Sequence, residues 1–324
     1  MSLSAQQEAP ARGESRGDWP REFAEDLAYV RTGIVNVFLI GPPGAGDRNW
    51  VLVDAGLPGW AGSIESSAAR RFGEGARPAA IILTHGHFDH VGSLQTLAEL
   101  WDAPIYAHEL ELPYLTGRSP YPPPDPTVGG GALASLSWMF PRGPINLGDR
   151  VQALPAGGGV PKLPGWRWIH TPGHTPGHVS FFRDDDRTLI AGDAFVTVKQ
   201  ESALAVLSQR REVHGPPAYY TADWDAARRS VEDLAALAPV IAGTGHGVPM
   251  GGEELHAGLL ALACNFARDA VPQYGRYVER PARATLEGVV SLPPDVHHPL
   301  LTTLAGFGAG VAAGLLLRAS RRGR

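Results

Sequence analysis

The sequence predicts an α/β sandwich in which short strands form the centre and helices cover the outside. Three observations support this fold class. Short apolar runs rich in Val, Ile and Leu end in glycine, proline or polar residues along most of the chain. Longer amphipathic stretches flank groups of these runs instead of following each one, unlike a strict strand–helix alternation. The chain also holds 40 glycines and 29 prolines in 324 residues, so turns must divide it into many short elements.

Strand and helix patterns follow one another closely in the first part of the chain. The β-branched run 34–40 ends at Gly41, and the run 50–54 ends at Gly56, which predicts a hairpin at a sheet edge. A buried strand at 79–83 continues directly into a histidine-rich segment. The patterns thus predict strands at 34–40, 50–54, 79–83 and 103–107, and helices at 60–72 and 92–101.

A proline- and glycine-rich segment interrupts this order in the middle of the chain. Residues 117–131 read GRSPYPPPDPTVGGG, which is typical of a long loop or lid. Elements resume after it, with strands expected at 151–154, 166–170, 179–183, 188–191 and 240–242, and helices at 223–238 and 253–270. We therefore expect a disordered tail at 1–22, one main domain at 23–272, a linker at 273–298, and an apolar helix with a basic end at 299–324.

The C-terminal segment has the composition of a membrane anchor. Residues 299–317 carry no charge and would reach about 28 Å as a helix, close to the thickness of a bilayer core. Gly306, Gly310 and Gly314 recur every fourth residue, a spacing that also suits pairing of two copies as a homodimer. A helix packed on the domain is the alternative, although its glycines would weaken it in water. The polar N-terminus lacks the apolar core of a secretion signal, so we expect a cytoplasmic protein that this helix could tether.

Charge and cysteine content exclude several functions. The net charge of −5 does not favour a nucleic-acid partner. Cys264 is the single cysteine, so the chain can form neither an internal disulfide nor a cysteine-based zinc cage. We expect Cys264 to be a small buried residue within its helix.

Metal-binding side chains are concentrated directly after the strand at 79–83. His85, His87, Asp89 and His90 lie within six residues. Two of them, His85 and His87, would project to one side of an extended segment. Imidazole and carboxylate without thiolate favour an open, hydrolytic metal site over a structural one.

Three later segments repeat this arrangement of a ligand-type residue after a strand. The first is HTPGHTPGH at 170–178, which contains His174 and His178, and the second is AGDA with Asp193. The third is GTGHG with His246. Ligands offered by several strand ends to one edge of a sandwich would form a single site.

Together these motifs resemble the metallo-β-lactamase-fold hydrolase superfamily, whose mark H-x-H-x-D-H is matched by residues 85–90. The resemblance extends over roughly 25–265 and implies an αββα sandwich of two mixed sheets flanked by helices, with 23–272 as the catalytic domain. It further implies a dinuclear centre of the glyoxalase II-like or lactonase-like branches. A cysteine ligand of some true β-lactamases has no counterpart here. In that pattern the first metal is held by His85, His87 and His174, the second by Asp89, His90 and His246, and Asp193 bridges both.

The implied chemistry is hydrolysis. Two divalent cations lower the pKa of bound water, so that a metal-bridged hydroxide can attack the carbonyl of an ester, lactone or thioester. Asp89 would both bind metal and orient the nucleophile. Asp54, at a strand end, is expected to contact a ligand histidine from outside, and His178 is a second candidate for that role. Zinc is the expected ion, although iron and manganese accept the same ligands.

Substrate recognition is assigned to the loops at 113–142 and 195–222. They carry aromatic residues, among them Tyr121, Trp138, Tyr219 and Tyr220, which suit a small-molecule substrate with an apolar portion unless they pack against the core instead. Two alternatives share the fold. One is an iron-dependent oxidoreductase similar to persulfide dioxygenases, and the other is a nuclease of the superfamily.

Overall fold

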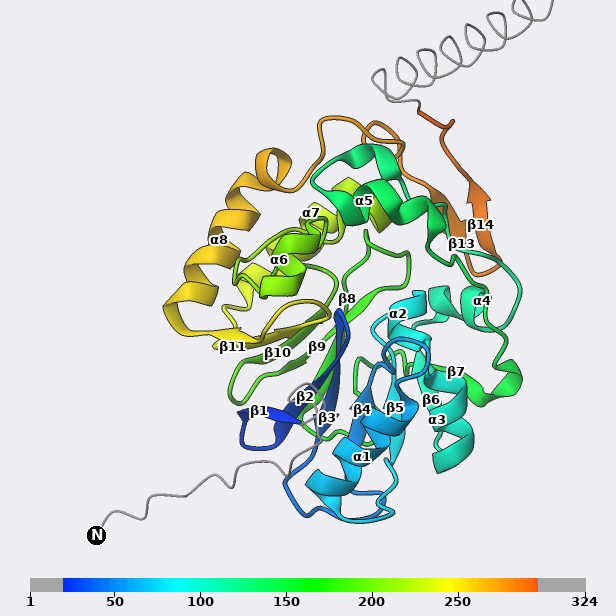
Figure 1. Ribbon diagram of the computed structural model, residues 1–324, viewed down its shortest axis with the longest axis vertical. Coiled ribbons are helices and arrows are strands. Elements are labelled where there is room, and N and C mark those ends of the chain that lie inside the picture. The colour runs from blue at the N-terminus through cyan, green and yellow to red at the C-terminus, as the bar shows by residue number, and fades with distance from the viewer. Residues whose placement is uncertain (1–19, 297–324) are drawn as a thin grey trace, which may run out of the picture.

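The computed structural model describes residues 20–296, and two stacked β-sheets form their centre (Figure 1). The larger sheet has seven strands that lie side by side in chain order. Neighbouring strands are antiparallel from β1 through β4 and parallel from β4 through β7. These strands are β1 (Arg21–Ala24), β2 (Leu27–Thr32), β3 (Val35–Ile40), β4 (Val51–Val53), β5 (Ala80–Ile82), β6 (Ile105–Ala107) and β7 (Val151–Ala153).

The second sheet has five strands in the spatial order β12-β11-β10-β9-β8. Its pairs are antiparallel except for β10 and β11, which run parallel and are connected through helix α7. Its strands are β8 (Trp166–His170), β9 (Val179–Arg183), β10 (Thr188–Gly192), β11 (Ile241–Thr244) and β12 (Met250–Gly251). Both sheets are therefore mixed, as the resemblance implies.

Helices cover the outer face of each sheet. The longer ones are α1 (Ala61–Phe72) and α3 (Leu94–Trp101) on the seven-stranded sheet, and α7 (Trp224–Ala236) and α8 (Gly252–Asp269) on the five-stranded sheet. Shorter helices are α2 (Phe88–Val91), α4 (Leu112–Leu115), α5 (Ala132–Leu136) and α6 (Ala203–Ser208). Single 3-10 turns occur at Glu109–Glu111, Pro126–Val128, Ser137–Met139, Gly148–Arg150 and Ala218–Tyr220. The predicted αββα sandwich is confirmed.

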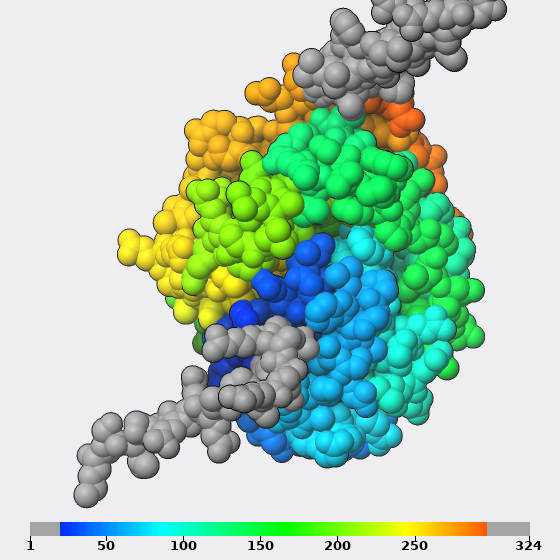
Figure 2. All heavy atoms as spheres, viewed as in Figure 1, coloured from blue at the N-terminus to red at the C-terminus, as the bar shows by residue number. Residues whose placement is uncertain are grey.

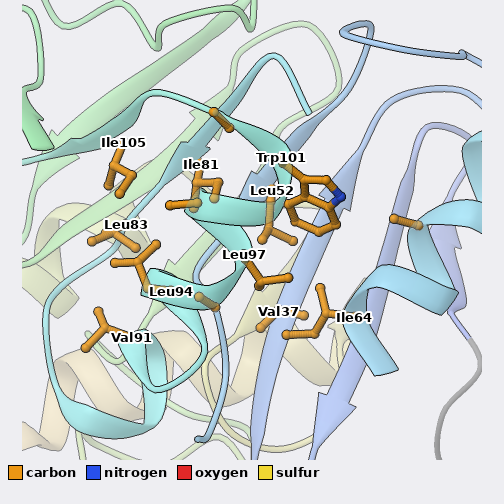
Figure 3. Packing of buried hydrophobic residues seen from close by; sticks show 14 of the residues in the cluster. Val37, Leu52, Ile64, Ile81, Leu83, Val91, Leu94, Leu97, Trp101 and Ile105 are labelled. Atoms are coloured by element: carbon orange, nitrogen blue, oxygen red, sulfur yellow. The ribbon is translucent and has the colours of Figure 1, made fainter. Parts of the chain in front are cut away.

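Alternation along the central strands builds the layers. In β3, Val37 and Leu39 face the helices α1 and α3, while Phe38 and Ile40 face the second sheet. Both faces are apolar because both are covered, which explains why this run reads as uniformly β-rich in the sequence. Figure 3 shows the outer layer, in which Leu52 and Ile81 meet Leu97 and Trp101 of α3.

The structure corrects two expectations about individual elements. The strands predicted at 34–40 and 50–54 do pair as an antiparallel hairpin, but they lie inside the sheet rather than at its edge. The reason is that β1 and β2 extend the sheet on one side, and their mixed polar sequence gave no strand signal. Cys264 is exposed, not buried, because the buried face of α8 is formed by Leu255, Leu259, Leu262 and Phe266.

The segments around the predicted loop and linker are packed. Within 117–131, Tyr121 and Asp125 are buried, and the Asp125 carboxylate accepts hydrogen bonds from Thr127 and Arg276. The region expected as a linker at 273–298 contains a hairpin of β13 (Arg283–Thr285) and β14 (Gly288–Ser291). Val289 of this hairpin donates its backbone N–H to Ser119.

Two predictions fall largely outside the described residues. These are the tail at 1–22, of which 20–22 are described, and the apolar helix at 299–324. Among residues 20–296, no helix is both long enough and apolar enough to cross a membrane.

Candidate metal centre

The predicted ligand residues converge at one edge of the sandwich. Residues 84–90 follow β5 of the larger sheet, and His174 lies in the turn between β8 and β9 of the smaller one. Asp193 and His246 follow the ends of the parallel strands β10 and β11. All seven side chains are buried, namely His85, His87, Asp89, His90, His174, Asp193 and His246.

Three histidines form one end of this cluster, which we call the three-histidine group. It consists of His85, His87 and His174. His87 Nδ1 lies 3.0 Å from Nε2 of His85 and 3.0 Å from Nε2 of His174. The ligand atoms of the group therefore lie close enough to share one cation.

Asp89, His90 and His246 form the other end, which we call the carboxylate group. His246 Nε2 lies 3.5 Å from Asp89 Oδ2. Asp193 lies between the two groups. Its Oδ2 is 3.1 Å from His246 Nε2, 3.5 Å from His90 Nε2 and 3.5 Å from His174 Nε2. One carboxylate thus touches members of both groups.

Outer hydrogen bonds fix which ring nitrogen of each histidine points inward. His90 Nδ1 lies 2.8 Å from the Asp54 carboxylate, and His246 Nδ1 lies 2.7 Å from the carbonyl oxygen of Ile34. Both partners are acceptors only, so each Nδ1 must carry the proton. In the neutral rings, both Nε2 lone pairs then face Asp193.

Two threonine hydroxyls act in the same way on the three-histidine group. Thr84 Oγ1 donates to Asp54, which leaves it as the acceptor for His85 Nδ1 at 3.1 Å. Thr221 Oγ1 donates to the carbonyl of Pro217, and lies 3.4 Å from His174 Nδ1. The Nε2 lone pairs of these two rings then face His87.

This donor set fits a cation. Lone pairs that face one another in a buried site repel unless a cation or proton lies between them. Two atoms of these ligands, His90 Nε2 and Asp193 Oδ1, are buried without a hydrogen-bond partner. Nitrogen and carboxylate oxygen without thiolate suit zinc, iron or manganese.

The two groups differ in electrostatics. Burial and the neighbouring imidazoles lower the pKa of His85 and His87 well below the usual value, and burial lowers the pKa of His174 to about 3. Burial acts the same way on His90, but Asp193, Asp54 and Asp89 outweigh it and hold its pKa well above the usual value. The pKa of His246 is raised because Asp193 outweighs its burial.

The two residues expected to support ligands from outside both lie against the centre. Asp54 accepts hydrogen bonds from the backbone N–H of Thr84 and from His90. His178 accepts at Nε2 from the backbone N–H of Asp193, over 2.9 Å, while its Nδ1 lies 2.9 Å from Thr171 Oγ1. Asp54 thus orients the ring of the ligand residue His90, whereas His178 contacts the backbone of the ligand residue Asp193.

The sequence of the chain matches a known family over most of its length. The sequence model described as "Metallo-beta-lactamase superfamily" matches residues 30–246. The chain belongs to this superfamily. It is 50% identical over 242 residues to "Probable metallo-hydrolase YflN" of Bacillus subtilis, an alignment that covers 75% of this chain and 91% of the relative. A second B. subtilis protein, the uncharacterized YobT, is 34% identical over 66% of this chain and 83% of its own.

Solved structures of the superfamily share the fold. A beta-lactamase domain protein from Burkholderia ambifaria has a TM-score of 0.55 at 19% identity, over 79% of this chain and 75% of its own. BJP-1, a subclass B3 metallo-beta-lactamase of Bradyrhizobium japonicum, has a TM-score of 0.51 at 22% identity, over 77% of this chain and 92% of its own. These likenesses establish the sandwich architecture and leave the substrate open.

Aromatic residues beside the centre are mostly buried. Tyr220 stacks on His87 with ring centroids 4.2 Å apart, and its hydroxyl donates to the carbonyl of Pro141. Tyr219 is also buried and contacts Phe140. Tyr121 lies under His87 in the core rather than at the surface. These rings form the wall of the site.

Several exposed apolar side chains lie on two neighbouring helical segments. Trp138 is 66% exposed in the turn after α5, and Leu207 is 81% exposed on α6. α5 and α6 lie side by side on the face in Figure 2, and Leu133 N of α5 donates a hydrogen bond to the carbonyl of Glu201, just before α6. Of the loop aromatics singled out in the sequence, Trp138 is thus the one that is largely exposed, and most of the others pack against the core.

Two supporting residues have no signal in the sequence motifs. Asn36 of β3 donates its side-chain amide to the carbonyls of Thr244 and Gly247, and so holds the loop that carries His246. Glu111 accepts hydrogen bonds from the His85–His87 loop and from the His174 loop. A lone carboxylate inside the apolar stretch 110–115 is the one feature that could have singled out Glu111.

Proposed function

We propose that this protein is a dinuclear metal-dependent hydrolase that acts on an ester, lactone or thioester of a small molecule. The observation that carries the proposal is the inward direction of four histidine Nε2 lone pairs, two toward Asp193 and two toward His87. Acceptor partners on the outer nitrogens of His85, His90, His174 and His246 set this direction. Such an arrangement is stable only around positive charge.

The residues divide the work of such a site. His85, His87 and His174 would hold one cation, Asp89, His90 and His246 the other, and Asp193 both. Two divalent cations there would lower the pKa of bound water and polarise the substrate carbonyl. Asp89, as a member of the carboxylate group of residues, would orient the attacking water. Tyr220 and Tyr219 exclude bulk water from the side of His87, which strengthens every charge interaction inside.

The metal is proposed to be zinc, and the substrate to have an apolar part. Zinc is supported by the histidine-rich ligand set, because imidazole nitrogen is one of the commonest zinc ligands. An apolar part is supported by the aromatic wall and by the exposed Trp138 and Leu207 nearby. The name of the B. subtilis relative, a probable metallo-hydrolase, supports hydrolysis as the reaction type.

Metal content and substrate turnover test this proposal together. The purified protein is expected to hold two zinc ions per chain and to hydrolyse members of a panel of lactones, thioesters and aryl esters. His87→Ala is expected to abolish this turnover, because it removes the central nitrogen of the three-histidine group. Turnover by His87→Ala at the rate of the unaltered protein would overturn the assignment of the site.

The oxidoreductase alternative gives a different result in the same experiment. A persulfide dioxygenase would hold one iron and consume oxygen with a persulfide substrate. A single iron does not need the carboxylate group, and the structure brings all of that group's residues together. Oxygen uptake with one iron per chain would replace the hydrolase proposal.

A further inference from the structure

The three-histidine group takes its ligands from two different sheets. His85 and His87 follow β5 in the larger sheet, whereas His174 lies between β8 and β9 in the smaller one. Hydrogen bonds within either sheet cannot fix the distance between these loops. One backbone hydrogen bond, from Val179 N to Thr84 O, links the two segments directly.

Glu111 supplies the remaining links. It lies in the turn Glu109–Glu111 after β6, and its side chain is fully buried. One carboxylate oxygen, Oε2, accepts from the backbone N–H of Gly86 and from the hydroxyl of Tyr121. The other, Oε1, accepts from Thr175 Oγ1 and from the backbone N–H of Gly177, each over 2.8 Å.

These four contacts use the full acceptor capacity of a carboxylate. A carboxylate offers about four lone-pair positions and donates nothing when ionised. Two of its partners here are backbone N–H groups, which cannot reverse their role. Burial raises the pKa of Glu111, and its hydrogen bonds act in the opposite direction.

The glycines beside the ligands are explained by this close contact. Gly86 lies between His85 and His87, and a Cβ there would lie 2.6 Å from the Tyr121 hydroxyl. A Cβ at Gly177 would lie 2.8 Å from Glu111 Cγ. Gly177 thus lies against Glu111 itself and Gly86 against Tyr121, the donor to Glu111, so a side chain at either glycine would push its loop away.

We propose that Glu111 is a positioning residue of the metal centre, which holds the His85–His87 loop and the His174 loop at the spacing that one cation needs. This inference rests on the proposed function, because it assumes that the three-histidine group binds metal. It assigns Glu111 to that group alone. The His246 loop has a separate support in Asn36.

The test compares the same substitution in two backgrounds. His246→Ala leaves the three-histidine group intact, and His87→Ala leaves the carboxylate group intact. Glu111→Gln is added to each, because glutamine keeps the size of the side chain but opposes one of the two backbone N–H groups with its own NH2. Zn²⁺ affinity is measured by competition with a chromophoric chelator, and circular dichroism and the thermal midpoint report the fold.

Glu111→Gln is expected to weaken Zn²⁺ binding about 10–100-fold in the His246→Ala background, the usual effect of losing an outer partner of a metal ligand. It is expected to leave the affinity unchanged in the His87→Ala background. Tyr121→Phe, which removes one donor to Glu111 and keeps the ring, is expected to act in the same direction but more weakly. If the double variants do not fold, the Zn²⁺ affinity of Tyr121→Phe tests the positioning role of Glu111 instead.

A matched control is Glu201→Gln. Glu201 is also buried, but its carboxylate accepts from the backbone of Ala218 instead of a ligand loop. Glu201→Gln is expected to leave the Zn²⁺ affinity unchanged in both backgrounds. Equal weakening by Glu111→Gln in both backgrounds, or none in a folded His246→Ala background, would overturn the inference alone. Failure of the unaltered protein to bind Zn²⁺ would overturn the proposed function.

Discussion

The three-histidine group and the carboxylate group meet at Asp193, yet they differ in charge and in how they are held. Histidine supplies ligands to both, but the pKa of His85 is well below the usual value while that of His90 is well above it. The two residues are five positions apart in the chain. Three surrounding carboxylates raise the pKa of His90, whereas His85 is buried among other imidazoles.

The supports of the two groups differ as well. In the carboxylate group, His90 is held by the Asp54 side chain and His246 by the backbone of Ile34, both acceptors. In the three-histidine group, neutral hydroxyls contact His85 and His174, and Glu111 acts on the loops rather than on the rings. A carboxylate therefore sets ring direction in one group and loop spacing in the other.

The largest effect is expected where the two groups join. Asp193→Asn replaces the one carboxylate that touches both, with little change in size. We expect loss of both cations and a fall in kcat/KM of at least about 10³-fold, equivalent to roughly 4 kcal/mol of transition-state stabilisation. Metal analysis and steady-state kinetics on the responding substrate would measure it. A variant that keeps two cations would show that the groups bind independently of Asp193.

A smaller and uneven effect is expected from Asp54→Asn. The amide can present its NH2 to His90 Nδ1 and so reverse the inward lone pair. We expect about 10–100-fold weaker binding of the second Zn²⁺. A smaller loss is expected at the first, because the Thr84 hydroxyl that contacts His85 also donates to this carboxylate. Asp125→Asn is the matched control, because that buried carboxylate accepts from Thr127 and Arg276 and not from a histidine. Equal losses in the two variants would mean that Asp54 acts only on stability.

The smallest effect is expected from Tyr220→Phe. The ring that stacks on His87 stays, and only the hydrogen bond to Pro141 O is lost. We expect the free energy of unfolding to fall by about 0.5–1.5 kcal/mol, with Zn²⁺ affinity unchanged. Urea unfolding and the chelator titration would measure these quantities. A change in affinity at the three-histidine group would assign Tyr220 a direct part in holding His87.

Much of the fold could be predicted from local patterns. The strands at 166–170 and 179–183 occur as expected, because short apolar runs bounded by turn residues favour buried strands. β2 was missed because Arg31 and Thr32 interrupt its apolar character, although most of the strand is buried. Its burial depends on the second sheet, which local patterns do not describe.

The site could be predicted as a set of residue types but not as a geometry. The segment 84–90 carries its metal-ligand chemistry in its own spacing, so it stands out in any single sequence. Glu111 and Asn36 could not be found that way, since their roles depend on loops that are distant in the chain. The sequence likewise left open whether Tyr121 lines the site or packs in the core, and the structure buries it.

The sequence by itself determined the family of folds, the order of most elements and the side chains available to a metal. These follow from short-range periodicity and from the chemistry of imidazole and carboxylate. Tertiary structure alone decided which nitrogen of each ring points inward, which carboxylates raise the pKa of His90, and which residue spaces the ligand loops. Hydrogen-bond direction and electrostatic environment are properties of neighbours in space, and the packing of the two sheets chooses those neighbours.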